Sequence, residues 1–370
     1  MKRFAAYDPP EYLEWRATPE ALGRYRATIT EHADRARIVA ALDEAALFAL
    51  YEGLVRNRLH DIMLKRWVKS GVISKAWLGT GEEASTIGPV HALERSGAER
   101  DLVSPMIRNA GACHEMGMPV ADMLRGYLGT EDSPSGGRDG HVGDLRFGVL
   151  APISHLADMV PVAAGVALAL RQAGSRRLVL SWVGDGSTKT TGFHEGLNFA
   201  AVQRLPAIFI IQNNQVALGT RLDQHGAGDF VDWPAMYGVA GAMFDGNHVL
   251  DAYAATMLAV QRARAGEGTS LLIAETFRMG GHATHDEREA RETFSPELFQ
   301  SWGSRDPIGL FEAWLEDEGF ERTRLAEIEA RVSDEVDQSA EDALTSRESA
   351  MPEPGTVLND VYAHPIGEHR

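Results

Sequence analysis

The sequence has little cysteine: Cys113 is the single one among 370 residues. A lone cysteine cannot close a disulfide within the chain, which excludes a disulfide-stapled fold and favours a reducing compartment. We expect Cys113 to be a small residue buried in the core.

A basic excess is missing as well. Lys and Arg total 36 against 53 Asp and Glu, which gives a formal net charge of −17. Nucleic-acid-binding domains normally carry a basic patch that releases counterions from the phosphate backbone. We therefore expect no nucleic-acid partner.

Long hydrophobic runs are also absent. The longest apolar run covers residues 160–170 and is too short to cross a bilayer. The first residues, MKRFAAYDPPEY, turn polar and proline-rich without the apolar segment of a secretion signal. We expect no membrane association and a cytoplasmic location, or a mature organelle-matrix form.

The chain does contain enough apolar material for a large core. At 44% hydrophobic residues it suits one large α/β domain with appendages, or two domains. Continuously apolar strands are predicted over 178–183, 208–211 and 270–274, and helices over 160–171, 192–203 and 251–264. Apolar strands that alternate with helices predict an α/β fold, a parallel sheet flanked by helices on both faces.

The remaining segments predict three parts. Residues 1–42 form a mixed N-terminal arm, residues 43–320 the α/β domain, and residues 321–370 an amphipathic C-terminal helix and tail. Apolar spacing predicts helices over 43–68, with Leu47, Leu50, Leu54 and Ile62, and over 82–93. The Gly-, Ser-, Pro- and Asp-rich stretch 130–148 is too long for a simple connector and is typical of a functional loop.

Polar residues follow two of the predicted strands. Gly184-Asp185-Gly186-Ser187 ends the first, and Asn213-Asn214 ends the next. Ligands of open parallel sheets bind beyond the carboxyl ends of the strands, so we expect the two stretches to share one ligand. Asp185, the Asn214 amide and the Val216 main-chain carbonyl supply oxygen ligands that suit Mg²⁺ or Ca²⁺. Glycines allow a close approach, and the helix that follows favours an anion at its N-terminus, so the pattern predicts a metal-diphosphate site.

A dinucleotide-binding turn is the rival interpretation of this stretch. It requires a third glycine where Lys189 stands, and an acidic residue where the next strand ends in Gln212. A tight turn and a polar strand end without function explain either feature alone, but explain the pair poorly.

GDG followed by NN, with Asp185 and Asn214 29 positions apart, resembles the thiamine diphosphate motif, whose Asp and Asn hold Mg²⁺ on the diphosphate. The intervening FHEGLNFAAVQRLPAIFIIQNN is similar to the alpha subunit of the decarboxylating component of 2-oxo acid dehydrogenase complexes. That family acts on pyruvate, branched-chain 2-oxo acids or acetoin. The likeness covers residues 43–315 and recurs in the tail LNDVYAHP.

The resemblance implies further site residues. MIRNAG is similar to the segment whose arginine, here Arg108, binds the diphosphate, and SHLADMVPVAAG implies that Ser154 and Leu156 contact the aminopyrimidine side. TFRMGGHATHDE implies that His282 stands over the thiazolium as an acid/base group. His141 resembles a histidine near the substrate channel. Taken alone, HATHDE also permits a transition-metal cluster.

Some positions depart from the family pattern. Met106 and Ile107 stand where relatives often have a polar residue and a tyrosine near the phosphates, and Gln212 replaces a residue that is sometimes arginine. We expect these changes to remove phosphate contacts, so that Arg108 has fewer other residues beside it to bind the phosphates. Val216 replaces a common tyrosine, and Ala283 replaces a serine that is phosphorylated in some animal enzymes.

The implied function is oxidative decarboxylation of a 2-oxo acid, with acyl transfer to a lipoyl group of an acyltransferase component. Nothing in this chain matches the carboxylate that activates the cofactor, which the family places on a beta subunit. The resemblance therefore implies a heterotetramer of two alpha and two beta chains. A non-catalytic scaffold subunit and an acetoin-cleaving alpha subunit stay open as alternatives, and the sequence does not choose the substrate.

Overall fold

The computed structural model describes residues 15–356, so the start of the arm and the tail stretch LNDVYAHP lie outside the described residues. Its centre is a five-stranded sheet in the order β1-β2-β3-β7-β6, with all neighbours parallel. The strands are β1 (Leu102–Ser104), β2 (Val179–Gly184), β3 (Ala207–Asn213), β6 (Ala240–Asp245) and β7 (Ser270–Glu275). The predicted α/β class is confirmed. The two edge strands were not predicted.

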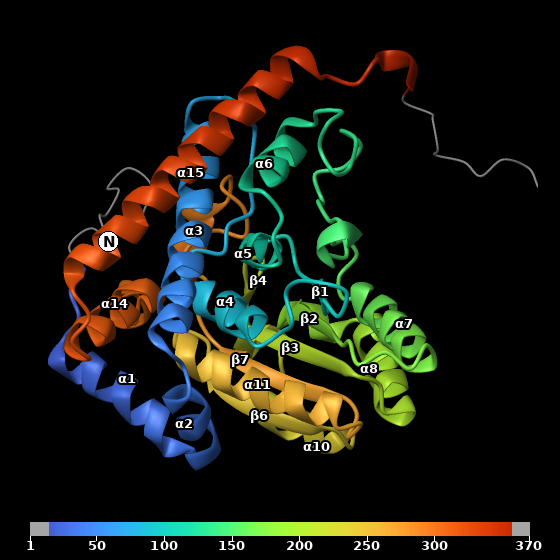
Figure 1. The fold of residues 1–370 in the computed structure, drawn as a ribbon, viewed down its shortest axis with the longest axis vertical. Coiled ribbons are helices and arrows are strands. Elements are labelled where there is room, and N and C mark those ends of the chain that lie inside the picture. Colours follow the sequence, from blue (N-terminus) through green and yellow to red (C-terminus); the bar gives the residue numbers. More distant parts are fainter. Residues whose placement is uncertain (1–14, 357–370) are drawn as a thin grey trace, which may run out of the picture.

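Side chains alternate between the two faces of the sheet. Along β2, Leu180 and Trp182 pack on one face, whereas Val179 and Val183 pack on the other. The first face is covered by α4 (Glu83–His91) and α11 (Val249–Arg264), and the second by α7 (Met159–Gln172) and α8 (Thr191–Gln203) (Figure 1). Both faces are apolar because helices cover both.

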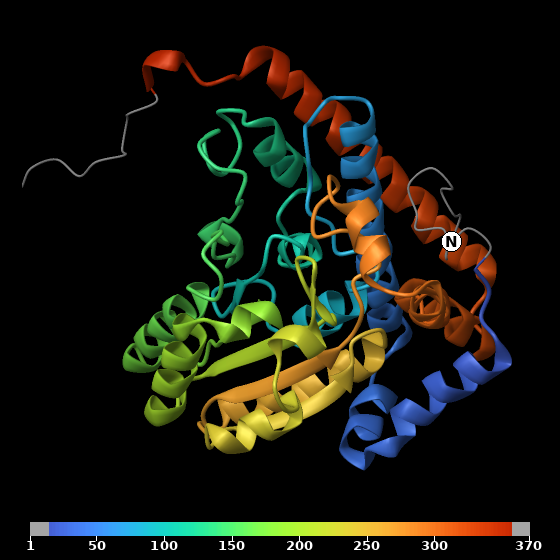
Figure 2. The same ribbon diagram turned by 180° about the vertical axis from the view of Figure 1, so that it is seen from behind.

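Long helices form a second layer beside the sheet. The predicted helix over 43–68 is α3 (Glu44–Lys69); the Asp43 carboxylate accepts a hydrogen bond from the Ala46 N–H at 2.8 Å and so caps its first turn. The C-terminal helix α15 (Arg322–Ser349) packs along α3 and α6 (Val120–Leu128) (Figure 2). It buries Leu325, Ile328 and Val332.

The predicted arm contains two helices that the sequence reading did not anticipate, α1 (Pro19–Glu31) and α2 (Ala33–Ala40). They pack on α14 (Pro307–Asp317) and α11 of the same chain. The division into arm, α/β domain and C-terminal helix stays a prediction.

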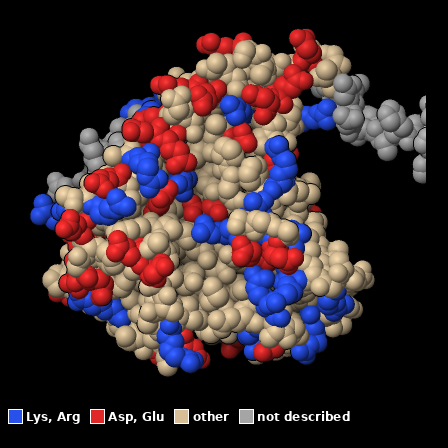
Figure 3. Space-filling view, viewed as in Figure 1, with Lys and Arg blue, Asp and Glu red and all other residues tan. Residues whose placement is uncertain are grey.

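The other elements are short. They are α5 (Ala110–Glu115), η2 (Leu145–Phe147), η3 (Gly186–Lys189), β4 (Val216–Ala217), β5 (Thr220–Arg221), α9 (Leu222–His225), η4 (Phe230–Asp232), α10 (Trp233–Met236), α12 (Glu287–Thr293), α13 (Pro296–Gly303) and η5 (Pro354–Thr356). Within residues 15–356, no helix is long and apolar enough to cross a membrane. Acidic side chains are prominent along α15, and basic ones gather near α7 and α8 on the same face (Figure 3).

Candidate cofactor site

A cavity of about 570 Å³ opens at the carboxyl edge of the sheet. The segments that follow β1, β2, β3 and β7 all turn into its wall, which is the expected ligand position in a parallel sheet. The predicted site residues that line it are Arg108, His141, Ser154, Leu156, Gly184, Asp185, Gly186, Ser187, Val216 and His282. Asn214 lies directly behind this wall and is almost fully buried.

Asp185 presents a carboxylate oxygen that lacks a partner. Its Oδ1 accepts a hydrogen bond from the Gly186 N–H at 2.7 Å, whereas its buried Oδ2 has no hydrogen-bond partner among the described residues. Burial raises the pKa of this carboxyl above its ordinary value. A buried oxygen without a partner is costly, so Oδ2 fits the role of a cation ligand.

Asn214 and Val216 flank a tight turn at the end of β3. The intervening Gln215 has φ +74°, a left-handed conformation that non-glycine residues seldom adopt outside constrained sites. Asn214 Oδ1 accepts a hydrogen bond from the Val216 N–H at 3.3 Å, and Val216 then pairs with Arg221 in the β4–β5 hairpin. The donor set of one carboxylate, one amide oxygen and one main-chain carbonyl fits Mg²⁺.

The two glycines around Asp185 have different roles. A Cβ on Gly186 would lie 2.3 Å from the Ala217 Cβ, so Gly186 lets η3 pack against β4. A Cβ on Gly184 would meet its nearest atoms, Met106 Sδ and Ser187 Oγ, only at 3.8 Å. The helix predicted over 192–203 is α8, which begins at Thr191, and the four-residue η3 (Gly186–Lys189) precedes it.

Two positively charged side chains, those of Arg108 and Arg278, also line the cavity. Arg278 is held there by two main-chain carbonyls: its Nη2 donates to Leu218 O at 2.7 Å and its Nε to Gly280 O at 3.2 Å. Burial, and then repulsion by Arg108, lower the pKa of Arg278 to about 10. Two guanidinium groups beside one cavity suit an anionic ligand such as a diphosphate.

His282 lies in the loop after β7, close to these arginines. Burial lowers its pKa to about 4, and Arg108 and Arg278 contribute in the same direction, so the imidazole is neutral near pH 7. Asp286 Oδ1 accepts a hydrogen bond from the Ala283 N–H at 2.8 Å, which ties down the turn after His282. The part of the chain that the structure describes contains no cluster of three His, Cys, Asp or Glu side chains placed to hold a metal.

His141 joins two loops at the cavity. Asp139 Oδ1 accepts hydrogen bonds from the His141 N–H at 3.0 Å and from Nδ1 at 2.7 Å, and His141 Nε2 lies 3.1 Å from Ser154 Oγ. These contacts connect the functional loop predicted over 130–148 to the segment that carries Ser154 and Leu156. Leu156 is 58% exposed, so this rim is open to solvent.

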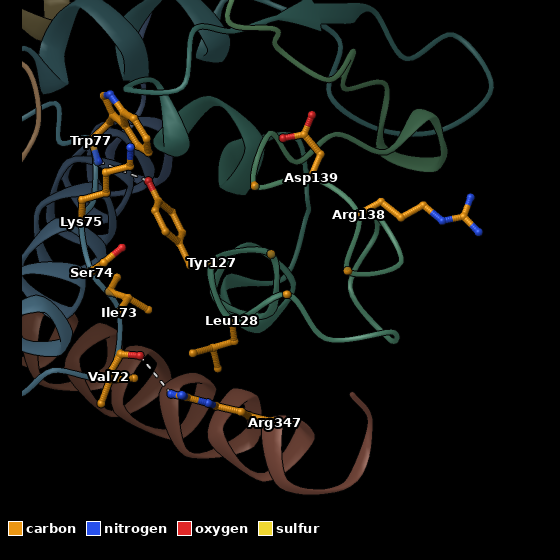
Figure 4. A pocket seen from close by; sticks show the side chains of 14 residues that line it. Val72, Ile73, Ser74, Lys75, Trp77, Tyr127, Leu128, Arg138, Asp139 and Arg347 are labelled. Atoms are coloured by element: carbon orange, nitrogen blue, oxygen red, sulfur yellow. Dashed lines mark hydrogen bonds between the residues drawn. The ribbon is translucent and has the colours of Figure 1, made fainter. Parts of the chain in front are cut away.

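A second cavity of about 360 Å³ lies beside the first, and Trp77 lines both (Figure 4). The main-chain N–H of Trp77 donates to Tyr127 Oη at 3.4 Å, and Arg347 Nη1 donates to Val72 O at 2.9 Å. Figure 4 shows Arg347 reaching from α15 to the segment that carries Trp77. The C-terminal helix therefore braces the wall of this second cavity.

Sequence reasoning missed Glu82, which is almost fully buried behind Asn214. Its Oε1 accepts hydrogen bonds from Gln212 Nε2 at 2.6 Å and Asn214 Nδ2 at 2.9 Å. No local signal marks it in the sequence, because an acidic residue at the start of a helix is already accounted for by the helix dipole. Gln212 is completely buried in this hydrogen-bond network.

The fold and the cavity together define a class, an α/β protein with a cofactor-sized cavity at the carboxyl edge of a parallel sheet. The chain belongs to the dehydrogenase E1 component family, whose model matches residues 52–354. It is 32% identical over 311 residues to the 2-oxoisovalerate dehydrogenase subunit alpha of Bacillus subtilis, covering 82% of this chain and 93% of that one.

Two further relatives are also alpha subunits of dehydrogenases that act on 2-oxo acids. The 3-methyl-2-oxobutanoate dehydrogenase subunit alpha of Mycobacterium tuberculosis is 32% identical over 295 residues, which cover 77% of this chain and 75% of that one. The pyruvate dehydrogenase E1 component subunit alpha of Staphylococcus aureus is 30% identical over 326 residues, which cover 84% and 83%. The expected family is confirmed.

Proposed function

We propose that this chain is the alpha subunit of a thiamine diphosphate- and Mg²⁺-dependent enzyme that oxidatively decarboxylates a 2-oxo acid. The observation that carries the proposal is the unpartnered, buried Oδ2 of Asp185, which lies at the carboxyl end of β2 beside the strand that delivers Asn214. The family membership supports the same reaction class. Pyruvate and a branched-chain 2-oxo acid are the candidate substrates.

Different residues of the chain would bind the metal, the diphosphate and the aminopyrimidine ring. Asp185, Asn214 and the Val216 carbonyl would hold Mg²⁺, while Arg108 and Arg278 would neutralise the diphosphate. Thiamine diphosphate, when bound, supplies the electron sink for decarboxylation. Ser154 and Leu156, which line the cavity, would contact the aminopyrimidine ring and help to orient it.

His282 would act as the acid/base group, and His141 would lie near the substrate channel. The neutral imidazole of His282 can accept a proton, and pairing of Arg108 with an anion raises the basicity of that imidazole because it offsets a repelling charge. Asp139 orients the His141 ring through Nδ1 and leaves Nε2 for the cavity rim. Acyl transfer to a lipoyl group of a separate acyltransferase component completes the proposed reaction.

A beta subunit would complete the site. Asp185 is the only carboxylate among the described residues that line the cavity, so a second carboxylate to activate the aminopyrimidine has to come from elsewhere. Val162 on α7 and Phe199 and Val202 on α8 are 45%, 42% and 70% exposed, and these helices pack side by side. Exposed apolar side chains on paired helices favour a partner there, in a heterotetramer of two alpha and two beta chains. We keep the cytoplasmic location as a prediction.

The test is to assay the chain alone and with its beta subunit against pyruvate, branched-chain 2-oxo acids and acetoin. We expect no decarboxylation by the chain alone and turnover of one 2-oxo acid class by the pair. Turnover by the pure chain would contradict the shared site, and a preference for acetoin would favour the acetoin-cleaving alternative. A pair that binds no thiamine diphosphate would favour the scaffold alternative.

A further inference from the structure

Glu82 occupies a fixed position directly behind the proposed metal ligands. Its side chain is 1% exposed, and it immediately precedes α4. Its own N–H donates to Gly79 O at 2.9 Å, and Ser85 Oγ donates to its carbonyl at 2.7 Å. Asp61 holds Gly79 in turn through the Gly79 N–H, so this backbone has little freedom to move.

The Glu82 carboxylate determines which way the Asn214 amide faces. A carboxylate only accepts hydrogen bonds, so the atom of Asn214 that lies 2.9 Å from Glu82 Oε1 is the NH₂ group. Asn214 Oδ1 is then directed away from Glu82, to the Val216 N–H and the turn that flanks Asp185. An amide turned the other way would present a donor where a cation needs an oxygen.

The second oxygen of the same carboxylate faces Arg108. Glu82 Oε2 lies 3.5 Å from Arg108 Nε, and both atoms are buried without a hydrogen bond to another described residue. With Nε turned to Glu82, the terminal guanidinium nitrogens are left for the cavity that Arg108 lines. Glu82 also offsets the repulsion between Arg108 and Arg278.

Gln212 extends this arrangement to the main chain beside Arg108. Its Nε2 donates to Glu82 and its Oε1 accepts from Asn109 Nδ2 at 2.9 Å, while Asn109 Oδ1 accepts from the Met106 N–H at 3.1 Å. A continuous chain of hydrogen bonds thus links β3 with the segment 106–109. Glu82 is the acceptor at which this chain and the bond from Asn214 meet.

We propose that Glu82 is a positioning residue with two separable tasks. One oxygen orients the Asn214 amide toward the cation, and the other orients Arg108 toward the diphosphate. Glu82 does not line the cavity, so it acts through these two residues and not on the substrate. This inference rests on the proposed function.

Two substitutions separate the tasks. In Glu82→Gln the remaining oxygen can still accept from both Asn214 and Gln212, but an NH₂ group replaces the oxygen that faces the Arg108 Nε–H. Glu82→Ala removes both acceptors. A matched control is Glu115→Gln, which neutralises a buried carboxylate that pairs with Arg56 and His91 and does not line the cavity.

The measurements use the chain assembled with its beta subunit and do not depend on turnover. Electron paramagnetic resonance titration gives the affinity for Mn²⁺, as a substitute for Mg²⁺, at saturating thiamine diphosphate. Quenching of tryptophan fluorescence, with Trp77 and Trp182 in the cavity wall, gives the affinity for thiamine diphosphate at saturating Mg²⁺. Thermal unfolding of the cofactor-free assembly shows whether each variant is folded.

Glu82→Ala is expected to weaken Mn²⁺ binding about 10–100-fold, the usual effect of losing a residue that orients a metal ligand. Glu82→Gln should leave Mn²⁺ affinity close to wild type and weaken thiamine diphosphate about tenfold, the scale of one charge-assisted hydrogen bond. The control should change neither. Equal Mn²⁺ losses in the Gln and Ala variants, or wild-type affinities in a folded Gln variant, would overturn the proposal.

Asp185→Ala separates this proposal from the proposed function. If that variant keeps normal Mn²⁺ and thiamine diphosphate binding, the site itself is wrong. If it loses both while the Glu82 variants bind as wild type does, the site holds and only the role of Glu82 fails.

Discussion

Gly184 and Gln212 are register partners on the adjacent parallel strands β2 and β3. Asp185, which follows Gly184, and Asn214, two residues after Gln212, therefore leave the sheet at the same edge. This places Asp185 and Asn214, which are 29 positions apart in the sequence, beside one cavity. Helix α8 accounts for the intervening length, since it carries the chain back along the sheet between the two strands.

Asp185→Ala should abolish Mg²⁺-dependent binding of thiamine diphosphate. Its buried Oδ2 has no hydrogen-bond partner among the described residues, and removing it takes away the carboxylate among the three proposed Mg²⁺ ligands. Calorimetry on the assembly with the beta subunit measures this affinity. Asp223→Ala is the matched control, because Asp223 is an exposed carboxylate paired with Arg221. Unchanged cofactor affinity in the Asp185 variant would contradict the site.

Gly186→Ala should destabilise the chain through overlap with Ala217, because the new Cβ would lie 2.3 Å from the Ala217 Cβ. Overpacking of this kind costs about 1–3 kcal/mol. Gly165→Ala on α7 is the matched control, since a Cβ there has no neighbour within 4 Å. Replacing that helical glycine should raise the free energy of unfolding by about 0.5–1 kcal/mol. Urea denaturation of both variants checks the opposite signs.

The sequence was sufficient for the central part of the fold because buried parallel strands are continuously apolar. Helices α3, α7, α8 and α11 and strands β2, β3 and β7 lie where periodicity predicts them. The edge strand β6 was missed because its residues are only partly buried and include Gly241, so the pattern is weak. β1 is only three residues long and gives no pattern.

The site was predictable only where ligand chemistry requires a particular residue type. Asp185 and Asn214 stand out because an aspartate between glycines and paired asparagines are unusual strand ends. Glu82 reaches Asn214 across 132 positions, and no local pattern announces such a contact. The hydrogen bonds that hold both ends of the Gln212 side chain, to Glu82 and to Asn109, join residues that are also far apart in the sequence, so no local pattern predicts them either.

Arg108→Met should raise the pKa of His282 from its value of about 4, because it removes a repelling cation. The pKa of His60 is also about 4, but burial alone lowers it, so this value should not change. Histidine NMR titration distinguishes the two rings. The lowered pKa of His282 also makes the free energy of unfolding depend on pH. The unfolded chain takes up a proton at this histidine below about pH 6.5, whereas the folded chain does so only near pH 4, so this contribution to stability is complete above about pH 6.5 and is lost as pH falls toward 4. Equal shifts of both rings would contradict the assigned cause.

His282→Ala should separate two steps of the proposed reaction. A positioned acid/base group contributes about 10²–10⁴-fold, so reductive acylation of a lipoyl group should fall by that order while the cofactor still binds through Asp185 and Asn214. Decarboxylation with an artificial electron acceptor should fall less, because that acceptor does not need a proton delivered to the dithiolane sulfur. The competing explanation is that His282 only orders its loop, whose turn is tied by the Ala283 N–H to Asp286. Asp286→Ala loosens that turn and keeps His282, so it is the matched variant. Both rates, measured at saturating cofactor, decide the point: equal losses in His282→Ala, or no loss, would reject the acid/base role.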